Sequence, residues 1–135
     1  MVSDARSHLV EQFFASTLPK SEWTHEAHLT VCHHVLAQIG VSKALETLRV
    51  SIRRYNEAVG TANTDSSGYH ETITRYYLGA VEFSGPDLST VLKADLTSRN
   101  APLRFWSKPA LFSSEARNAW MPPDLAPLPW PVDQR

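Results

Sequence analysis

The sequence predicts an all-α protein: a single compact helical bundle of about five helices, wrapped by a C-terminal tail rich in proline and tryptophan. Two observations support this fold class. Apolar residues recur at helical spacing in successive stretches between residues 4 and 96, and no stretch alternates apolar and polar residues as a strand would. The chain has 135 residues, 42% of them apolar, which suits one domain over residues 1–135 with one core.

The first two helices are expected over residues 4–17 and 24–39. In the first, four apolar residues form one stripe: Leu9, Val10, Phe13 and Phe14. Pro19 ends this stretch, because proline has no amide hydrogen with which to continue a helix. The second stretch has the strongest helical pattern of the chain, and Gly40 suits its C-terminal cap.

The next three helices are separated by breaks rich in polar residues, glycine or proline. Ser42 is placed to cap a third helix, and the polar stretch 60–68 predicts the loop that follows it. A fourth helix is expected from about residue 69 to residue 83. Asp87 is then placed to cap a fifth, amphipathic helix that runs through Leu96.

The chain changes character after residue 100. Seven of its nine prolines and three of its four tryptophans lie there, which excludes a long helix but favours an ordered segment. One short helix is expected near residues 114–120, capped by Ser113 or Ser114. We expect residues 100–135 to wrap the bundle, and the tryptophans either close a ligand groove or serve packing alone.

Charge and cysteine content exclude several classes of function. Thirteen basic residues oppose 14 acidic ones, so the net charge of −1 offers no electrostatic basis for binding nucleic acid or an anionic membrane. No apolar run approaches the roughly 18 residues of a membrane span. The single cysteine excludes an internal disulfide, and the first residues do not form a secretory leader, which together predict a cytoplasmic protein.

Histidines are the unusual component of this chain, with four of the six between residues 25 and 34. At about 100° per residue, His25 and His28 share the inward stripe of their helix with Cys32, whereas His34 faces outward and His33 lies at the edge. Cys32 fits a small buried apolar residue better than a further metal ligand.

The inward pair predicts a metal site. Residues three apart on a helix have neighbouring side chains, so two imidazoles can converge on one ion. His70, expected in the first turn of the fourth helix, offers a third ligand if both helices begin at the same end of the bundle. The expected cofactor is one divalent transition metal, zinc first, with iron, copper, nickel and manganese as alternatives, because imidazole suits all of them.

Further residues are candidates for catalysis or substrate binding around that ion. Glu71 is either a general base or ligand beside the ion, or the partner of Arg75 in a solvated i,i+4 ion pair. Tyr77 is the second catalytic candidate. The candidates for binding substrate are Asn56, Arg75, Arg117 and Trp120.

Four segments carry a resemblance to a known family: W-T-H-E-A-H-L (23–29), Y-N-E-A-V-G-T-A-N-T (55–64), G-Y-H-E-T-I-T-R (68–75) and S-S-E-A-R-N-A-W-M-P-P-D-L (113–125). They resemble motifs of a family of small bacterial proteins, over most of residues 23–129. The resemblance implies no particular reaction or cofactor, but its histidine motifs coincide with His25, His28 and His70, and its tail motif implies an ordered tail. The arrangement is also similar to the metal-dependent four-helix DinB-like proteins, although the H-x-x-H spacing here is narrower.

The leading functional hypothesis is a small mononuclear metalloenzyme, with one ion held by His25, His28 and His70 and an open position for water or substrate. Hydrolysis, hydration or elimination on a small metabolite is the expected reaction class, and oxidation replaces it if the ion is iron or copper. The alternative is a metal-free module that binds a small molecule in an aromatic-lined pocket. A third interpretation is a homodimer or another protein complex, formed through the exposed helical faces.

Overall fold

The computed structural model describes residues 4–131 and confirms the all-α class. These residues form seven α-helices and three short 3-10 helices, and none of them lies in a strand. The α-helices are α1 (Asp4–Phe14), α2 (His25–Ile39), α3 (Val41–Ala58), α4 (Glu71–Ser84), α5 (Leu88–Lys93), α6 (Lys108–Leu111) and α7 (Ser114–Asn118). The 3-10 helices are η1 (Lys20–Glu22), η2 (Asp95–Thr97) and η3 (Ala101–Arg104). Residues 1–3 and 132–135 of the predicted domain and tail lie outside the described range.

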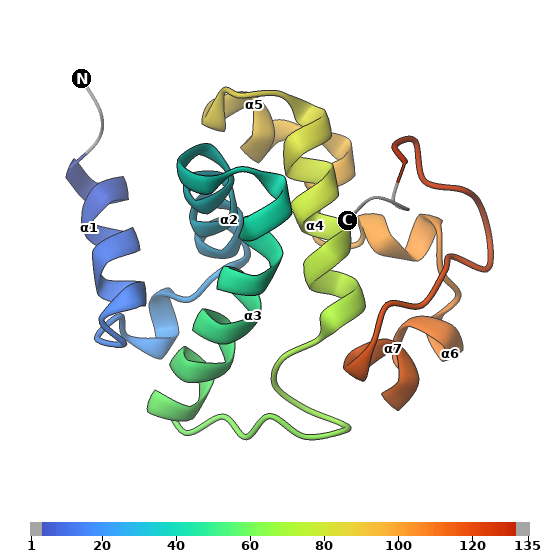
Figure 1. The fold of residues 1–135 in the computed structure, drawn as a ribbon, viewed down its shortest axis with the longest axis horizontal. Helices are drawn as coiled ribbons and strands as arrows, with labels where there is room; N and C mark the ends of the chain where they lie inside the picture. The colour runs from blue at the N-terminus through green and yellow to red at the C-terminus, as the bar shows by residue number, and fades with distance from the viewer. Residues whose placement is uncertain (1–3, 132–135) are drawn as a thin grey trace.

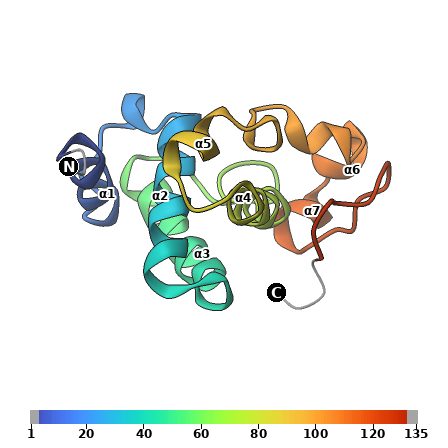
Figure 2. The same cartoon turned by 90° about the horizontal axis from the view of Figure 1, so that it is seen from above.

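Helix α4 stands between two parts of the molecule (Figure 1). On one side α2 and α3 pack against it and against each other, with α1 beyond them. On the other side lie α6, α7 and the segment that follows them. The view from above shows the same order along the long axis, with α5 over α2 and α4 (Figure 2). No helix in the described range is long and apolar enough to cross a membrane.

Side-chain caps hold several helix ends where the sequence predicts them. Asp87 accepts a hydrogen bond from the amide of Thr90 at 3.2 Å, and Ser113 accepts one from Ala116 at 3.1 Å. Gly40 ends α2 with φ of +80°, a conformation that L-residues with a side chain rarely adopt. Because Gly40 alone connects α2 to α3, Ser42 lies inside α3 rather than at its cap.

The first and fifth helices end three residues earlier than expected, at Phe14 and Lys93. The fourth helix differs at its start. It begins at Glu71, and His70 is its N-cap residue rather than a member of its first turn. The imidazole therefore leaves the helical stripe and turns back onto the backbone of α4. The predicted count of about five helices rises to seven, because the tail contains α6 as well as the expected α7.

The first core lies between α1, α2, α3 and one side of α4. It contains the fully buried Phe13 and Leu48 together with Tyr55, whose hydroxyl donates to the carbonyl of Leu18 at 2.7 Å. Trp23 stacks on Phe13 with ring centroids 4.6 Å apart. This core positions the N-terminal half of α2, where His25 and His28 lie.

The second core joins the other side of α4 to the tail. Trp106 is fully buried and edge-on to Tyr76, with ring centroids 5.7 Å apart, and Trp130 packs against the backbone of Gly79. A methyl group at Gly79 would approach Trp130 Cε2 to 2.7 Å, so the indole occupies the space that any larger residue would need. Trp106 and Trp130 thus pack into a core. Of the two roles expected for the tail tryptophans, closing a ligand groove or packing alone, these two have the second.

Candidate functional site

Two adjoining cavities lie beside the N-terminal half of α2. The first, called here the helix cavity, has about 320 Å³ and is lined by Trp23, His25, His28, Leu29, Val31, Cys32, Leu48, Ile52, Ile73, Thr74, Tyr77 and Arg99. The second, the loop cavity, has about 430 Å³ and is lined by Trp23, His28, Ile52, Asn56, Thr61, Gly68, Tyr69, His70, Ile73, Thr74, Phe112 and Arg117. Five residues line both, so the two cavities form one groove, which holds six of the nine predicted site residues.

His28 lies at the junction of the two cavities and presents an unprotonated nitrogen there. Its Nδ1 lies 2.8 Å from the carbonyl oxygen of Thr24. A carbonyl oxygen only accepts, so Nδ1 carries the proton, and in the neutral ring the Nε2 lone pair is available. Nε2 has no hydrogen-bond partner among residues 4–131.

The surroundings keep that ring neutral. Desolvation lowers the pKa of His28 to about 4, and the charge of nearby His25 acts in the same direction. The face of the imidazole lies against Trp23 with ring centroids 3.8 Å apart. The His28 side chain remains exposed to solvent, which reaches it through the groove.

His25 has a similar arrangement in the helix cavity. Its Nε2 donates to the carbonyl oxygen of Thr97 at 2.7 Å, which leaves Nδ1 as the acceptor of the neutral ring. The ring stands edge-on to Tyr77, with centroids 5.1 Å apart. The 3-10 helix η2 therefore holds His25, across 72 residues of sequence.

His70 is differently placed, because both of its ring nitrogens are occupied. Nδ1 accepts from the amide of Ile73 at 3.1 Å and caps α4, while Nε2 donates to the carbonyl of Leu111 at 2.7 Å. Burial lowers the pKa of His70, and the positive charge of Arg117 contributes in the same direction. His70 thus connects α4 to the tail and has no lone pair left for a metal ion.

The structure does not bring the three histidines together as metal ligands. In the part of the chain that the structure describes, no three His, Cys, Asp or Glu residues lie close enough to hold one ion. The expected geometry also assumed that His70 belongs to the first turn of α4, which is wrong because its side chain caps that turn. Metal binding by His25, His28 and His70 stays a prediction without support from this geometry.

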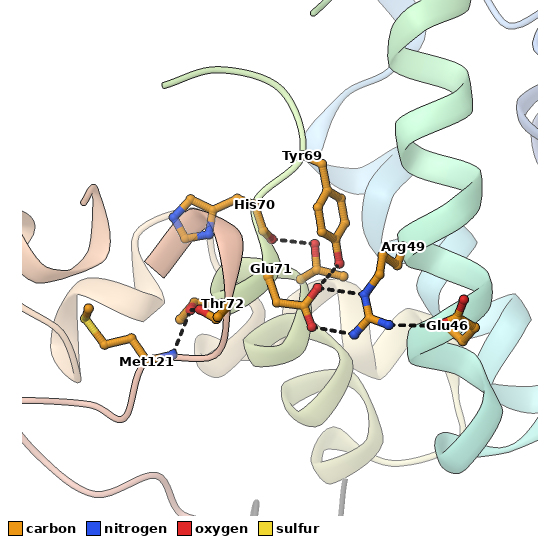
Figure 3. A network of polar contacts seen from close by, with 9 residues as sticks. Glu46, Arg49, Tyr69, His70, Glu71, Thr72 and Met121 are labelled. Atoms are coloured by element: carbon orange, nitrogen blue, oxygen red, sulfur yellow. Dashed lines mark hydrogen bonds and ion pairs between the residues drawn. The ribbon is translucent and has the colours of Figure 1, made fainter. Parts of the chain in front are cut away.

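Glu71 points away from His70, toward Arg49 of α3 (Figure 3). Its two carboxylate oxygens accept from Arg49 Nε at 3.0 Å and Nη2 at 2.6 Å, and Oε1 also accepts from the Tyr69 hydroxyl at 2.8 Å. Burial raises the pKa of Glu71, but the hydrogen bonds to Arg49 and Tyr69 outweigh it, and the net pKa is lowered. This carboxylate is buried and pairs with the partly exposed Arg49, so it is not the solvated residue of an i,i+4 pair, although the charge of Arg75 also lowers its pKa.

Tyr77 and Asn56 line the groove while serving the fold. The Tyr77 hydroxyl donates to the carbonyl of Ser98 at 2.7 Å, and burial raises its pKa, so its proton is engaged by the backbone of the segment after η2. Asn56 donates to Asn63 Oδ1 at 3.0 Å in the loop cavity. Cys32 is buried in the helix cavity, where burial raises its pKa to about 12, as expected of an apolar thiol.

The remaining predicted binding residues separate into two groups. Arg117 lines the loop cavity, where its Nη1 donates to the carbonyl of Gly68 at 2.9 Å. The Arg75 guanidinium instead lies over the ring of Trp120, 4.8 Å from its centroid, and Trp120 packs edge-on against Trp106. Neither Arg75 nor Trp120 lines the groove, because α4 and the tail fold them into the second core's margin.

The sequence reasoning missed several residues that shape this site. Arg49 was not among the predicted site residues, yet its guanidinium binds the carboxylate of Glu71. Asn63 organises the loop before α4: its Oδ1 accepts from the amide of Tyr69 at 2.9 Å, and its Nδ2 donates to the carbonyl of Arg53 at 3.1 Å. The signal that pointed toward Asn63 was its place in the resemblance motif 55–64.

Comparison with protein-family models, curated proteins and solved structures gives no match. The resemblance to a family of small bacterial proteins therefore stays a prediction. The site must be interpreted from its own geometry.

Proposed function

We propose that this protein binds a small organic molecule in the groove, with His28 Nε2 accepting a hydrogen bond from it. The observation that carries the proposal is the fixed state of that ring. The carbonyl of Thr24 accepts the Nδ1 proton, and the lowered pKa keeps the ring neutral, so Nε2 is an acceptor without a partner among the described residues. This is the metal-free alternative of the sequence analysis.

The size and lining of the groove support this proposal. Both cavities lie within the range of about 300 to 1,000 Å³ that is typical of ligand pockets. Their walls combine apolar and aromatic side chains with a few polar groups, which is the usual composition of a site for an organic ligand. Trp23 and Tyr77 supply flat aromatic surfaces beside the two histidine acceptors.

The proposal is tested with 2-naphthol and naphthalene, which differ only by the hydroxyl group that His28 would accept. We expect 2-naphthol to bind more tightly by about tenfold, since one net hydrogen bond contributes roughly 1 kcal/mol. His28→Phe keeps an aromatic ring and should abolish this difference, whereas His34→Phe, outside the groove, should preserve it. Binding is followed by amide chemical shifts of groove residues, and the absence of saturable shifts for both compounds contradicts the proposal.

The metalloenzyme stays the second candidate, favoured by one observation: His25 and His28 both line the helix cavity, and each keeps an unprotonated ring nitrogen. Metal analysis of protein purified without chelators tests it. A transition metal near one equivalent, lost in the His25→Ala/His28→Ala variant, would support this candidate; less than about a tenth of an equivalent would exclude it. A homodimer and a cytoplasmic location likewise stay predictions.

A further inference from the structure

We infer that the ligand of this groove is an organic carboxylate with an apolar body, whose carboxylate pairs with Arg117 in the loop cavity while its body enters the helix cavity. This inference deepens the binding function proposed above and rests on it. It depends on the charges that line the groove, on the way Arg117 is held, and on the apolar side chains that line the helix cavity.

The charges along the groove have one sign. Of the lysine, arginine, aspartate and glutamate residues that the structure describes, Arg99 alone lines the helix cavity and Arg117 alone lines the loop cavity. The chain as a whole has 14 acidic and 13 basic residues, so the groove departs from the composition of the protein. A site bordered only by cationic groups favours an anion.

Arg117 is held in position before any ligand arrives. Its Nη1 donates to the carbonyl oxygens of Gly68 at 2.9 Å and Tyr69 at 3.4 Å. Gly68 is itself fixed: its φ is +80°, and a side chain there would approach Asn63 Oδ1 to 2.6 Å. The other N–H groups of Arg117 have no partner among residues 4–131, and a guanidinium offers them to a carboxylate as a planar pair.

The charge of Arg117 reaches into the cavity. His70 lines the same cavity, and after burial and its backbone hydrogen bonds the positive charge of Arg117 is the next influence on its pKa, lowering it. Arg117 is only half-buried, so its own desolvation is partial. The Arg99 side chain is exposed, where solvent and salt screen its charge, and Arg117 is therefore the stronger anion site.

The helix cavity offers an apolar surface for the body of the molecule. The residues that line only this cavity include Leu29, Val31 and Leu48, which are buried and apolar. Those that line only the loop cavity include Asn56, Thr61 and Arg117 together with the aromatic side chains of Tyr69 and Phe112. His28 and Trp23 line both cavities and lie at their junction. The apolar body of a bound ligand would lie on one side of this junction and its carboxylate on the other. A single guanidinium balances one carboxylate, whereas a phosphate monoester would keep a second charge uncompensated.

The test compares acids with alcohols of the same shape: 2-naphthoate with 2-naphthalenemethanol, and octanoate with 1-octanol. We expect each acid to bind more tightly by about tenfold, with the preference decreasing as salt is added. Arg117→Gln should abolish the preference, so that each acid binds no more tightly than the alcohol of the same shape. Arg104→Gln, a tail arginine outside the groove, should keep the preference in full. If Arg117→Gln does not fold, Arg117→Lys, which keeps the charge but loses the fork, should reduce the preference without abolishing it.

The outcomes separate this inference from the proposed function. If the alcohols bind as tightly as the acids, the inference of a carboxylate ligand is overturned, but the proposal that the groove binds a small molecule is not. If none of these compounds binds saturably, and naphthalene and 2-naphthol do not bind either, both the carboxylate inference and the proposed binding function are overturned. Loss of the preference in Arg99→Gln rather than Arg117→Gln would overturn the assignment to Arg117, and tighter binding of 2-naphthyl phosphate than of 2-naphthoate would overturn the carboxylate in favour of a phosphate.

Discussion

Each of His25, His28 and His70 donates a ring proton to a backbone carbonyl oxygen from another turn or another element. At the scale of single residues, these carbonyl oxygens decide which ring nitrogen carries the proton and which one can accept a hydrogen bond. His28 and His25 each keep one acceptor nitrogen, whereas His70 uses its second nitrogen on the amide of Ile73. Three histidines that line one groove therefore have two different roles.

The lowered histidine pKa values predict a dependence of stability on pH. Below about pH 6.5 the unfolded chain binds protons at His28 and His70, while the folded chain resists them, in the case of His28 down to about pH 4. Stability should thus fall as the pH is lowered through this range, by at most about 1.4 kcal/mol per pH unit for each group. The share of His28 should be smaller than this limit, because its side chain is exposed.

Urea unfolding between pH 7.5 and pH 5 measures this slope. His28→Asn and His70→Asn should each flatten it, and the double variant should flatten it further, while asparagine at position 70 still caps α4. A wild-type stability that stays constant over this range, or rises toward pH 5, would contradict the prediction.

The ion pair between Arg49 and Glu71 is expected to stabilise the contact between α3 and α4. The Glu71 side chain is buried, while that of Arg49 is 33% exposed and also contacts Glu46. Partial exposure weakens the pair, so we expect Glu71→Gln to lower the free energy of unfolding by about 2 kcal/mol, below the range for a fully buried pair. A double-mutant cycle with Arg49→Met and Glu71→Gln should give a coupling of at least about 1 kcal/mol. A coupling near zero would show that the two residues act independently.

At the scale of elements, α4 connects every part of the site. Its N-terminal turn is capped by His70, its first residue binds α3, and Ile73, Thr74 and Tyr77 line the groove. Its opposite side carries Gly79, on which Trp130 packs. Helix α4 can pack against both cores because Gly79, which has no side chain, leaves space on the tail side for the indole ring of Trp130.

Gly79→Ala provides a test whose sign depends on Trp130. In a helix interior, alanine is normally more stable than glycine by about 1 kcal/mol. Here the added methyl group would collide with Trp130, so we expect the substitution to destabilise the protein by about 2 kcal/mol in thermal or urea unfolding. In a Trp130→Ala background the same substitution should become neutral or stabilising. A stabilising effect in the presence of Trp130 would contradict the packing described here.

At the scale of the whole molecule, the two cores share α4. Leu78 and Val81 belong to the first core, Tyr76 and Ala80 to the second, and Tyr77 packs against both. The groove opens on the first core's side, and its loop cavity also takes Phe112 and Arg117 from the tail. The tail therefore completes the candidate site and is not an appendage to it.

This sharing predicts that the two cores unfold together. Leu18→Ala in the first core and Leu111→Ala in the second should each lower the stability by about 2 to 4 kcal/mol, because both side chains are fully buried. Each variant should still show one transition, with far-UV circular dichroism and tryptophan fluorescence changing at the same temperature. Two separate transitions in either variant would show that the cores are independent.

The sequence alone determined the helices, their caps at Asp87 and Ser113, and the burial of Cys32. These features depend on neighbours three or four residues away, which periodicity and capping preferences describe. Only the tertiary structure decided the partners of His25, His70 and Glu71, which lie 72, 41 and 22 residues away in the chain. A stripe of apolar residues predicts which face of a helix is buried. The packing of the helices against one another decides which residues that face contacts. The predicted three-histidine centre depended on how α2 and α4 dock, which periodicity does not describe. That docking forms a groove at this place instead.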